Sequence, residues 1–140
     1  HYAYPNGAYE LSNGDPEIIT IVKQAGMLSG RGTQKPTRID HAVDMGDRWH
    51  SYNIIGGEST ESPATLQAAI DGCITYGESG VLMFHNLVTG VAGTAIEYNV
   101  DDFKAVVDYI AAKRDAGQIN VMTIPEWYAS VRASLDVAVA

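Results

Sequence analysis

The sequence predicts an α/β fold with a mostly parallel sheet, and two observations carry this prediction. The first is a purely apolar run at residues 81–84, between Gly80 and His85, which is typical of a strand covered by helices on both faces. The second is a pair of helical segments on either side of this run, at residues 62–77 and 99–117, each with a capping residue at its start and a glycine at its end. Alternating strands and helices indicate parallel pairing with right-handed crossovers.

Length and composition limit the class of protein. With 140 residues the chain has room for one domain, so residues 1–140 are interpreted as a single segment. A formal charge of -8, from 17 acidic and 9 basic residues, argues against a nucleic-acid surface and against an anionic membrane surface. No apolar run approaches the roughly 20 residues of a membrane span, which predicts no membrane insertion. The start has neither an initiator Met nor a signal-peptide pattern, so we expect the chain to be part of a longer protein.

The N-terminal part is expected to contain short strands around one helix. Residues 1–4 have the aromatic content of a strand end, and residues 5–7 form a turn. A helix begins after Asp15, which can cap it, and ends at Gly26. Its expected apolar face consists of Ile18, Ile21, Val22 and Ala25. The segments expected after this helix are a strand, a long surface loop and a second strand, at residues 27–29, 30–47 and 48–55.

The middle of the chain carries a clear helix pattern. After a polar connection over residues 56–61, Ser62 caps a helix that ends at Gly77. The only cysteine, Cys73, cannot form an internal disulfide and is interpreted as a small buried hydrophobe. The apolar residues at helical spacing are Leu66, Ala69, Ile70, Cys73 and Ile74. After the central strand, residues 87–95 are predicted to form a mobile binding loop of small residues.

The strongest helical period follows this loop. Either Asn99 or Asp101 can cap the helix, and Gly117 ends it. Its apolar positions are Phe103, Val106, Val107, Ile110 and Ala111. A short strand is then expected over residues 119–122, and a Thr-x-x-Glu capping box at residues 123–126 opens a last helix.

His85 is the first candidate for chemistry, because it directly follows the central strand. Ligands of α/β folds bind at the carboxyl ends of the parallel strands. Histidine is also the commonest general acid or base near neutral pH. A lone histidine at a strand end is often just a hydrogen-bonded structural residue, so position alone leaves both interpretations open.

The other candidates carry weaker signals. His41 and His50 lie near three aspartates, but their spacing fits no standard pair of metal ligands. Aromatic residues that can stack on sugars, or simply pack, are Tyr4, Tyr9, Trp49, Tyr52 and Trp127. Glycine-rich phosphate-binding patterns are absent, which argues against nucleotide binding. The Gly-x-Ser-x-Gly elbow of serine hydrolases is also absent.

Three segments resemble, in the same order and at similar spacing, the C-terminal half of the polysaccharide deacetylases. They are Ala-Tyr-Pro-Asn-Gly-Ala-Tyr at residues 3–9, Val-Leu-Met-Phe-His-Asn at residues 81–86, and the stretch over residues 102–123. The resemblance spans nearly the whole chain. It implies that the chain is the C-terminal half of a distorted (β/α) barrel.

The resemblance implies a metal-dependent hydrolase that removes acetyl groups from an N- or O-acetylated polysaccharide. In this family a divalent metal, expected to be zinc, is held by one Asp and two His, and water on the metal attacks the acetyl carbonyl. These ligands precede the matched region, and nothing like them occurs in this chain, so neither a metal ligand nor the catalytic base is assigned to it. The expected partners are the acetylated polysaccharide and either the missing N-terminal half or a second copy. The expected location is extracellular or on a cell surface, including that of a virion.

The resemblance also implies roles for individual residues. His85 corresponds to the general acid that protonates the leaving amine or alcohol, and the backbone N–H of Asn6 corresponds to a donor to the oxyanion. Met83 would help to form the pocket for the acetyl methyl group. Tyr4 and Trp49 are the candidates for contact with the sugar.

Two departures from the family pattern affect the site. Ala3 stands where many members carry an Arg that tunes the catalytic base, a trait of one branch of the family. Asn86 replaces the usual Asp beside the catalytic histidine, which is expected to lower the basicity of His85. A non-enzymatic alternative stays open, in which the same half-barrel is a carbohydrate-binding or structural module of an extracellular or virion surface protein.

Overall fold

A computed structural model of the chain describes residues 2–3, 17–31 and 54–130. The fold is mixed α/β, as predicted, and within these residues every strand pair is parallel. The chain separates into two compact units, one formed by residues 54–121 and the other by residues 1–53 with 122–140. Each unit is described by itself below.

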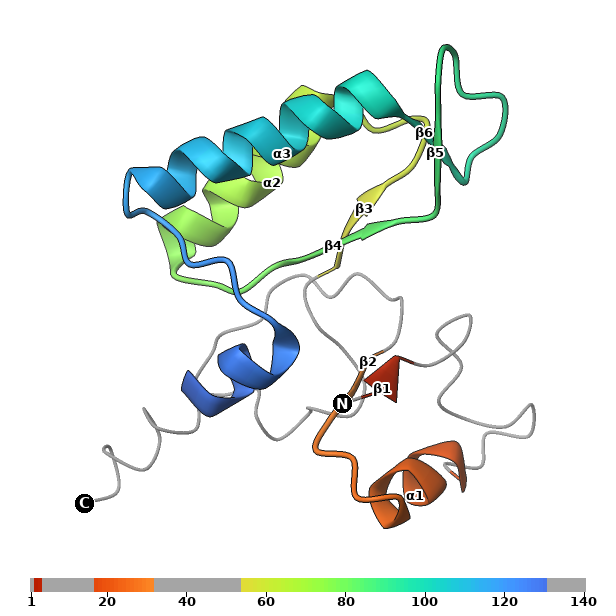
Figure 1. The fold of residues 1–140 in the computed structure, drawn as a ribbon, viewed down its shortest axis with the longest axis vertical. Coiled ribbons are helices and arrows are strands. Elements are labelled where there is room, and N and C mark those ends of the chain that lie inside the picture. Colours follow the sequence, from red (N-terminus) through yellow and green to blue (C-terminus); the bar gives the residue numbers. More distant parts are fainter. Residues whose placement is uncertain (1, 4–16, 32–53, 131–140) are drawn as a thin grey trace. The chain divides into compact units, whose positions relative to one another are not determined.

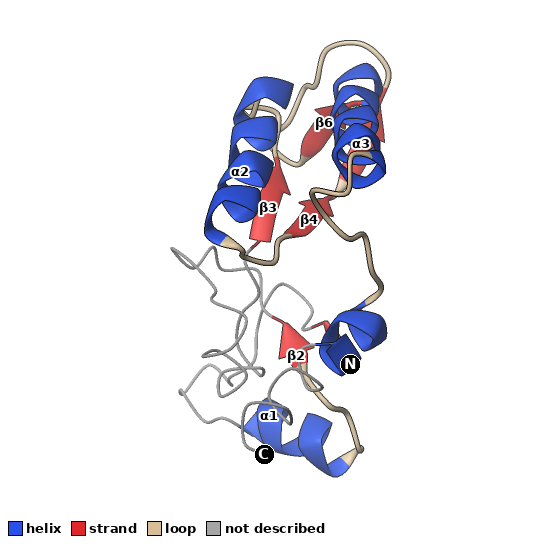
Figure 2. Cartoon of the chain, turned by 90° about the vertical axis from the view of Figure 1, so that its left-hand side faces the viewer, coloured by secondary structure: helices blue, strands red, loops and turns tan. Residues whose placement is uncertain are grey.

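The unit over residues 54–121 is built on a β-α-β arrangement (Figure 1). Strand β3 (Ile54–Gly57) pairs in parallel with β4 (Val81–Phe84), and helix α2 (Pro63–Tyr76) connects them. Helix α3 (Val100–Asp115) lies beside α2, and both helices lie on the same side of the β3–β4 pair. Figure 2 shows the same two helices side by side from a second direction.

Helix α2 has the start and end that the sequence predicts. The Ser62 side chain accepts a hydrogen bond from the Thr65 N–H at 3.2 Å, and Pro63 occupies the first turn, where its missing N–H costs nothing. Gly77 ends the helix with a φ of 66°, a left-handed conformation that favours glycine. Leu66 and Ile70 are buried as expected, whereas Ala69 is exposed.

Helix α3 is capped by Asn99, which decides between the two expected capping residues. The Asn99 side-chain oxygen accepts from the N–H groups of Asp101 at 2.7 Å and Asp102 at 3.2 Å. The first turn carries Asp101 and Asp102, and the last turn carries Lys113 and Arg114. Both pairs of charges interact favourably with the helix dipole. The apolar face is narrower than predicted, because Val106 is fully buried while Val107 is 42% exposed.

The core of this unit lies between the two helices and the strands. Its buried members are Leu66, Ile70, Tyr98 and Val106. Partly buried side chains pack around them from both helices and from β4, namely Cys73, Ile74, Leu82, Phe84, Phe103, Tyr109 and Ile110. Cys73 is therefore half-buried against the core, rather than fully buried as the sequence suggested.

The central strand is less buried than predicted. All four residues of β4 are half-buried, so the expectation of a strand covered on both faces is wrong. The physical reason is that α2 and α3 both pack on one side of the β3–β4 pair (Figure 1). An apolar run alone does not distinguish one covered face from two.

Two short strands flank a connection that contains most of the predicted loop over residues 87–95. β5 (Asn86–Val88) pairs in parallel with β6 (Glu97–Asn99), which leaves a connection over residues 89–96. Three-residue strands are too short to show an alternating pattern, so the sequence gives little sign of them. The polar connection before α2 is also shorter than predicted, because β3 continues through Gly57.

In the other unit, β1 (Tyr2–Ala3) pairs in parallel with β2 (Gly30–Arg31), and α1 (Glu17–Gln24) lies between them in sequence. The strand expected at residues 27–29 thus begins later, at Gly30. The buried face of α1 consists of Ile19 and Val22 with Ile18 against them, whereas Ile21 is 55% exposed and Ala25 is exposed. The predicted face was therefore rotated, since Ile18 and Ile19 fit the helical period equally well.

One of the two bonds of the predicted capping box at Thr123 is confirmed. The Glu126 carboxylate accepts hydrogen bonds from the Thr123 N–H and hydroxyl, both at 2.7 Å, and a helix follows over residues 124–130. The strand predicted at residues 119–122 is not formed, because these residues pair with no strand in the described part of the chain and Val121 is 61% exposed. The predicted loop over residues 32–47 and the predicted strand up to residue 53 lie outside the described residues.

No helix in the described ranges is both long and apolar enough to cross a membrane.

Candidate functional site

His85 lies between two parallel strand pairs. The last residue of β4, Phe84, pairs with Gly57 in β3, and the first residue of β5, Asn86, pairs with Glu97 in β6. His85 therefore follows a parallel strand directly, as the sequence predicts, and its side chain is exposed. An exposed histidine at the carboxyl end of a parallel strand stands where α/β folds bind their ligands.

Two backbone hydrogen bonds bring three chain segments together at this edge. The Asn86 N–H donates to the Ile96 carbonyl at 3.1 Å, and the Ser59 N–H donates to the Ala95 carbonyl at 3.2 Å. The segment after β3, the junction at His85 and the segment before β6 thus meet at one edge of the sheet.

The connection between β5 and β6 is held by side chains of β6. The Glu97 carboxylate accepts from the N–H groups of Gly93 at 2.7 Å and Thr94 at 3.1 Å. The Asn99 side-chain amide donates to the Gly90 carbonyl. Val91 is 97% exposed, so this connection presents an apolar side chain to solvent beside strands β5 and β6.

Of the residues predicted to form the site, the described ranges contain only His85 and Met83. Met83 is half-buried in β4 and pairs with Gly56 of β3. Asn6, Tyr4 and Trp49 lie outside the described residues, as do His41 and His50. The structure thus describes the positions of two candidates, His85 and Met83. The functional roles of all the candidates stay predictions.

The aromatic residues around Phe84 were not predicted as a unit. The Phe84 ring lies 5.1 Å from the Tyr98 ring and 4.9 Å from the Phe103 ring, measured between centroids. Tyr98 is 2% exposed, and its hydroxyl has no hydrogen-bond partner among the described residues. Burial, followed by the nearby charges of Asp102 and Glu61, raises the pKa of the Tyr98 phenol above its usual value.

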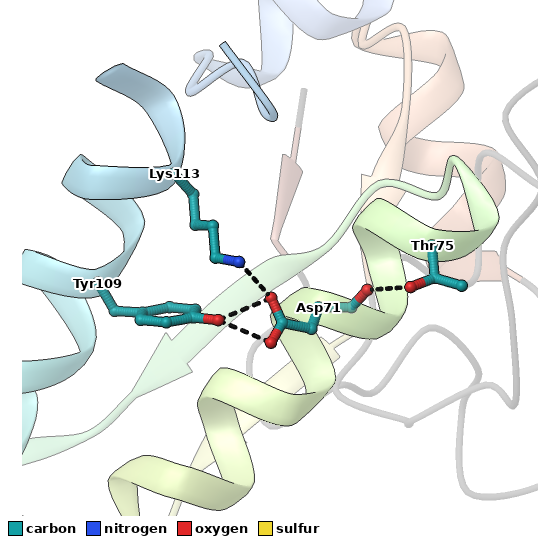
Figure 3. Close-up of polar contacts among 4 residues, drawn as sticks. All are labelled: Asp71, Thr75, Tyr109 and Lys113. Atoms are coloured by element: carbon teal, nitrogen blue, oxygen red, sulfur yellow. Dashed lines mark hydrogen bonds and ion pairs between the residues drawn. The ribbon is translucent and has the colours of Figure 1, made fainter. Parts of the chain in front are cut away.

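A second polar cluster joins α2 to α3 (Figure 3). The Tyr109 hydroxyl donates to both carboxylate oxygens of Asp71 at 2.7 Å, and the Lys113 ammonium lies 2.8 Å from Asp71 Oδ1. Hydrogen bonds from Lys113 and then Tyr109 lower the pKa of Asp71, and the bond to Asp71 raises the pKa of Lys113. The bonds within this cluster run from side chains of α3 to a side chain of α2, so we interpret it as a contact between helices.

The sequence offered one sign of this cluster. Tyr109 and Lys113 are four residues apart and therefore share a face of α3. Their partner on α2 could not be identified, because the register between two helices depends on packing.

The described residues include no group of three or more His, Cys, Asp or Glu side chains arranged to hold a metal ion. Comparisons with protein-family models, with characterised proteins and with solved structures found no match to this chain.

Proposed function

We propose that this chain is the C-terminal half of a distorted (β/α) barrel that removes acetyl groups from an acetylated polysaccharide. The observation that carries the proposal is the placement of His85, which is exposed and directly follows a parallel strand. This placement supports a catalytic role, because the carboxyl ends of parallel strands are where such folds carry out chemistry. The resemblance of residues 3–9, 81–86 and 102–123 to polysaccharide deacetylases supplies the reaction class.

In the proposed reaction His85 acts as the general acid. When the bond between the acetyl carbon and the sugar nitrogen or oxygen breaks, the leaving atom needs a proton, and the protonated imidazole of His85 donates it. Met83, two residues earlier in the chain, would contact the acetyl methyl group. The backbone N–H of Asn6 would stabilise the oxyanion, and Tyr4 with Trp49 would contact the sugar.

The residues of this chain do not fit the metal that the family uses. The described part has no suitable cluster, and the sequence lacks the Thr-Phe-Asp-Asp and His-x-x-x-His segments of the family. The proposal therefore places the metal ligands and the catalytic base in a part of the protein that precedes this chain. The assembled protein is proposed to act outside the cell.

The test is the variant His85→Ala in the complete protein, assayed for acetate release from one acetylated oligosaccharide. Loss of general acid catalysis predicts a fall in kcat of roughly 10²–10⁴-fold, with metal content and substrate binding nearly unchanged. Wild-type activity in the variant would contradict the proposed role. Metal loss together with activity would instead make His85 a ligand.

The wild-type protein supplies the second comparison. If it binds the oligosaccharide but releases no acetate under any metal condition, the non-catalytic carbohydrate-binding alternative is the better description.

A further inference from the structure

The position of His85 depends on the residue before it, and that residue is held from several sides. Phe84 is the last residue of β4, and its paired residue in β3 is Gly57. A Cβ atom placed on Gly57 would lie 1.9 Å from Cε1 and 2.1 Å from Cδ1 of the Phe84 ring. The ring therefore lies directly over the Gly57 backbone, in space that any side chain at position 57 would occupy.

Two other aromatic rings contact the Phe84 ring. The Phe103 ring, from α3, lies edge-on to it with an interplanar angle of 89° and a centroid distance of 4.9 Å. The Tyr98 ring, from β6, is tilted by 58° at 5.1 Å. Edge-to-face and tilted arrangements at these distances are the favourable geometries for aromatic pairs. We call these four residues the aromatic seat: Gly57, Phe84, Tyr98 and Phe103.

On its other side, His85 is held by the β5–β6 pair. Asn86 is fixed by the hydrogen bond from its N–H to the Ile96 carbonyl. The backbone of His85 is thus anchored before and after, while its own side chain remains exposed. This is the arrangement expected when one reactive side chain must be held in place without being buried.

We propose that the aromatic seat positions His85 for proton transfer, and that Phe103 is a positioning residue of the reaction. The proposal rests on the proposed function, because it assumes that His85 is the acid. Replacing Phe103 by Leu removes the edge contact, so Phe84 gains freedom and His85 moves with it.

The test measures Phe103→Leu in the complete protein, alone and combined with His85→Ala. A small displacement of a catalytic group lowers the rate of the chemical step more than it weakens binding, so we expect a roughly tenfold lower kcat with KM changed less than about twofold. In the His85→Ala background Phe103→Leu should change kcat by less than about twofold, because the group that it positions is gone. The matched control is Ile110→Val, on the same helix and packed against the same core. We expect it to leave kcat unchanged.

Three results would overturn the proposal. They are an unchanged kcat for Phe103→Leu, the same loss in both backgrounds, and an equal loss in Ile110→Val, which would indicate a general effect on packing.

A spectroscopic measurement separates this proposal from the proposed function. In protein labelled with ¹³C-histidine, Phe103→Leu should shift the His85 ring signal and speed hydrogen exchange of the Asn86 amide, whereas Ile110→Val should change neither. If His85→Ala keeps full activity but these signals respond, the function is wrong and the aromatic seat still holds His85. If the signals do not respond, the seat does not position His85, whatever the activity.

Discussion

Gly57 and Gly72 have opposite surroundings, and the same substitution should have opposite effects at the two positions. At Gly57 a Cβ atom overlaps the Phe84 ring, which Tyr98 and Phe103 hold in place. We expect Gly57→Ala to lower the free energy of unfolding by about 1–3 kcal/mol, the usual cost of overpacking. Denaturant titration followed by circular dichroism measures this change.

Gly72 is the matched control, because it lies within α2 and a Cβ atom there meets, among the described residues, no atom within 4 Å outside the local helix backbone. Alanine favours the helix over glycine by roughly 0.5–1 kcal/mol, so Gly72→Ala should raise the free energy of unfolding. Equal effects of the two substitutions would show that the Phe84 ring can move aside, so that the aromatic seat does not hold it in place.

At the scale of single residues, the sequence predicted the placement of His85 but not what holds it. His85 directly follows an unbroken apolar run, so a single stretch of sequence is enough to predict its place at the end of a strand. The seat under Phe84 requires Gly57 from a different strand and Phe103 from a helix that follows later. The sequence does not link these positions, because Gly57 meets Phe84 through the register of the parallel strands and Phe103 meets it through the packing of α3.

At the scale of elements, helices were predictable and short strands were not. The side chains of Ser62 and Asn99 accept from the first turn of their own helices, and the Glu126 side chain accepts from the Thr123 N–H, so the signal and the structure lie within a few residues. β5 and β6 contain three residues each and exist only through their pairing with each other. The predicted strand at residues 119–122 failed for the same reason, since an apolar segment without a partner is not a strand.

The contact between α2 and α3 predicts a pH dependence of stability. The pKa of Asp71 is lowered in the folded protein, chiefly by Lys113 and then by Tyr109. A lowered carboxyl pKa means that the contact stabilises the fold above the unfolded pKa, and this stabilisation is lost as pH falls through the folded pKa. Asp71→Asn removes the charge and should therefore flatten the loss of stability below about pH 4.

The measurement is thermal unfolding of wild type and Asp71→Asn at a series of pH values from neutral to acid. The difference in Tm between the two proteins should shrink as pH falls. Glu126, whose pKa is lowered by hydrogen bonds from Thr123, titrates in both proteins and cancels in the comparison. A Tm difference that stays constant with pH would mean that the Asp71 charge contributes nothing.

At the scale of the whole molecule, the parallel pairs predict how the isolated chain behaves. In the described ranges each sheet contains two strands. The proposed half-barrel would leave strand edges open where the missing strands belong, and open edges pair with other chains. We therefore expect the 140-residue chain alone to self-associate in sedimentation experiments. A stable, monodisperse monomer would count against the half-barrel assignment.

Asn99 combines two tasks in one side chain, and this limits which residues the position can accept. Its oxygen caps α3 while its nitrogen holds the Gly90 carbonyl of the connection before β6. Aspartate could replace the oxygen but has no hydrogen to donate, and the single hydroxyl of serine cannot lie at both places. Most helix starts tolerate Ser, Thr, Asp or Asn interchangeably. Here the mutational tolerance is narrower, because a substitution that suits the helix would release the neighbouring loop.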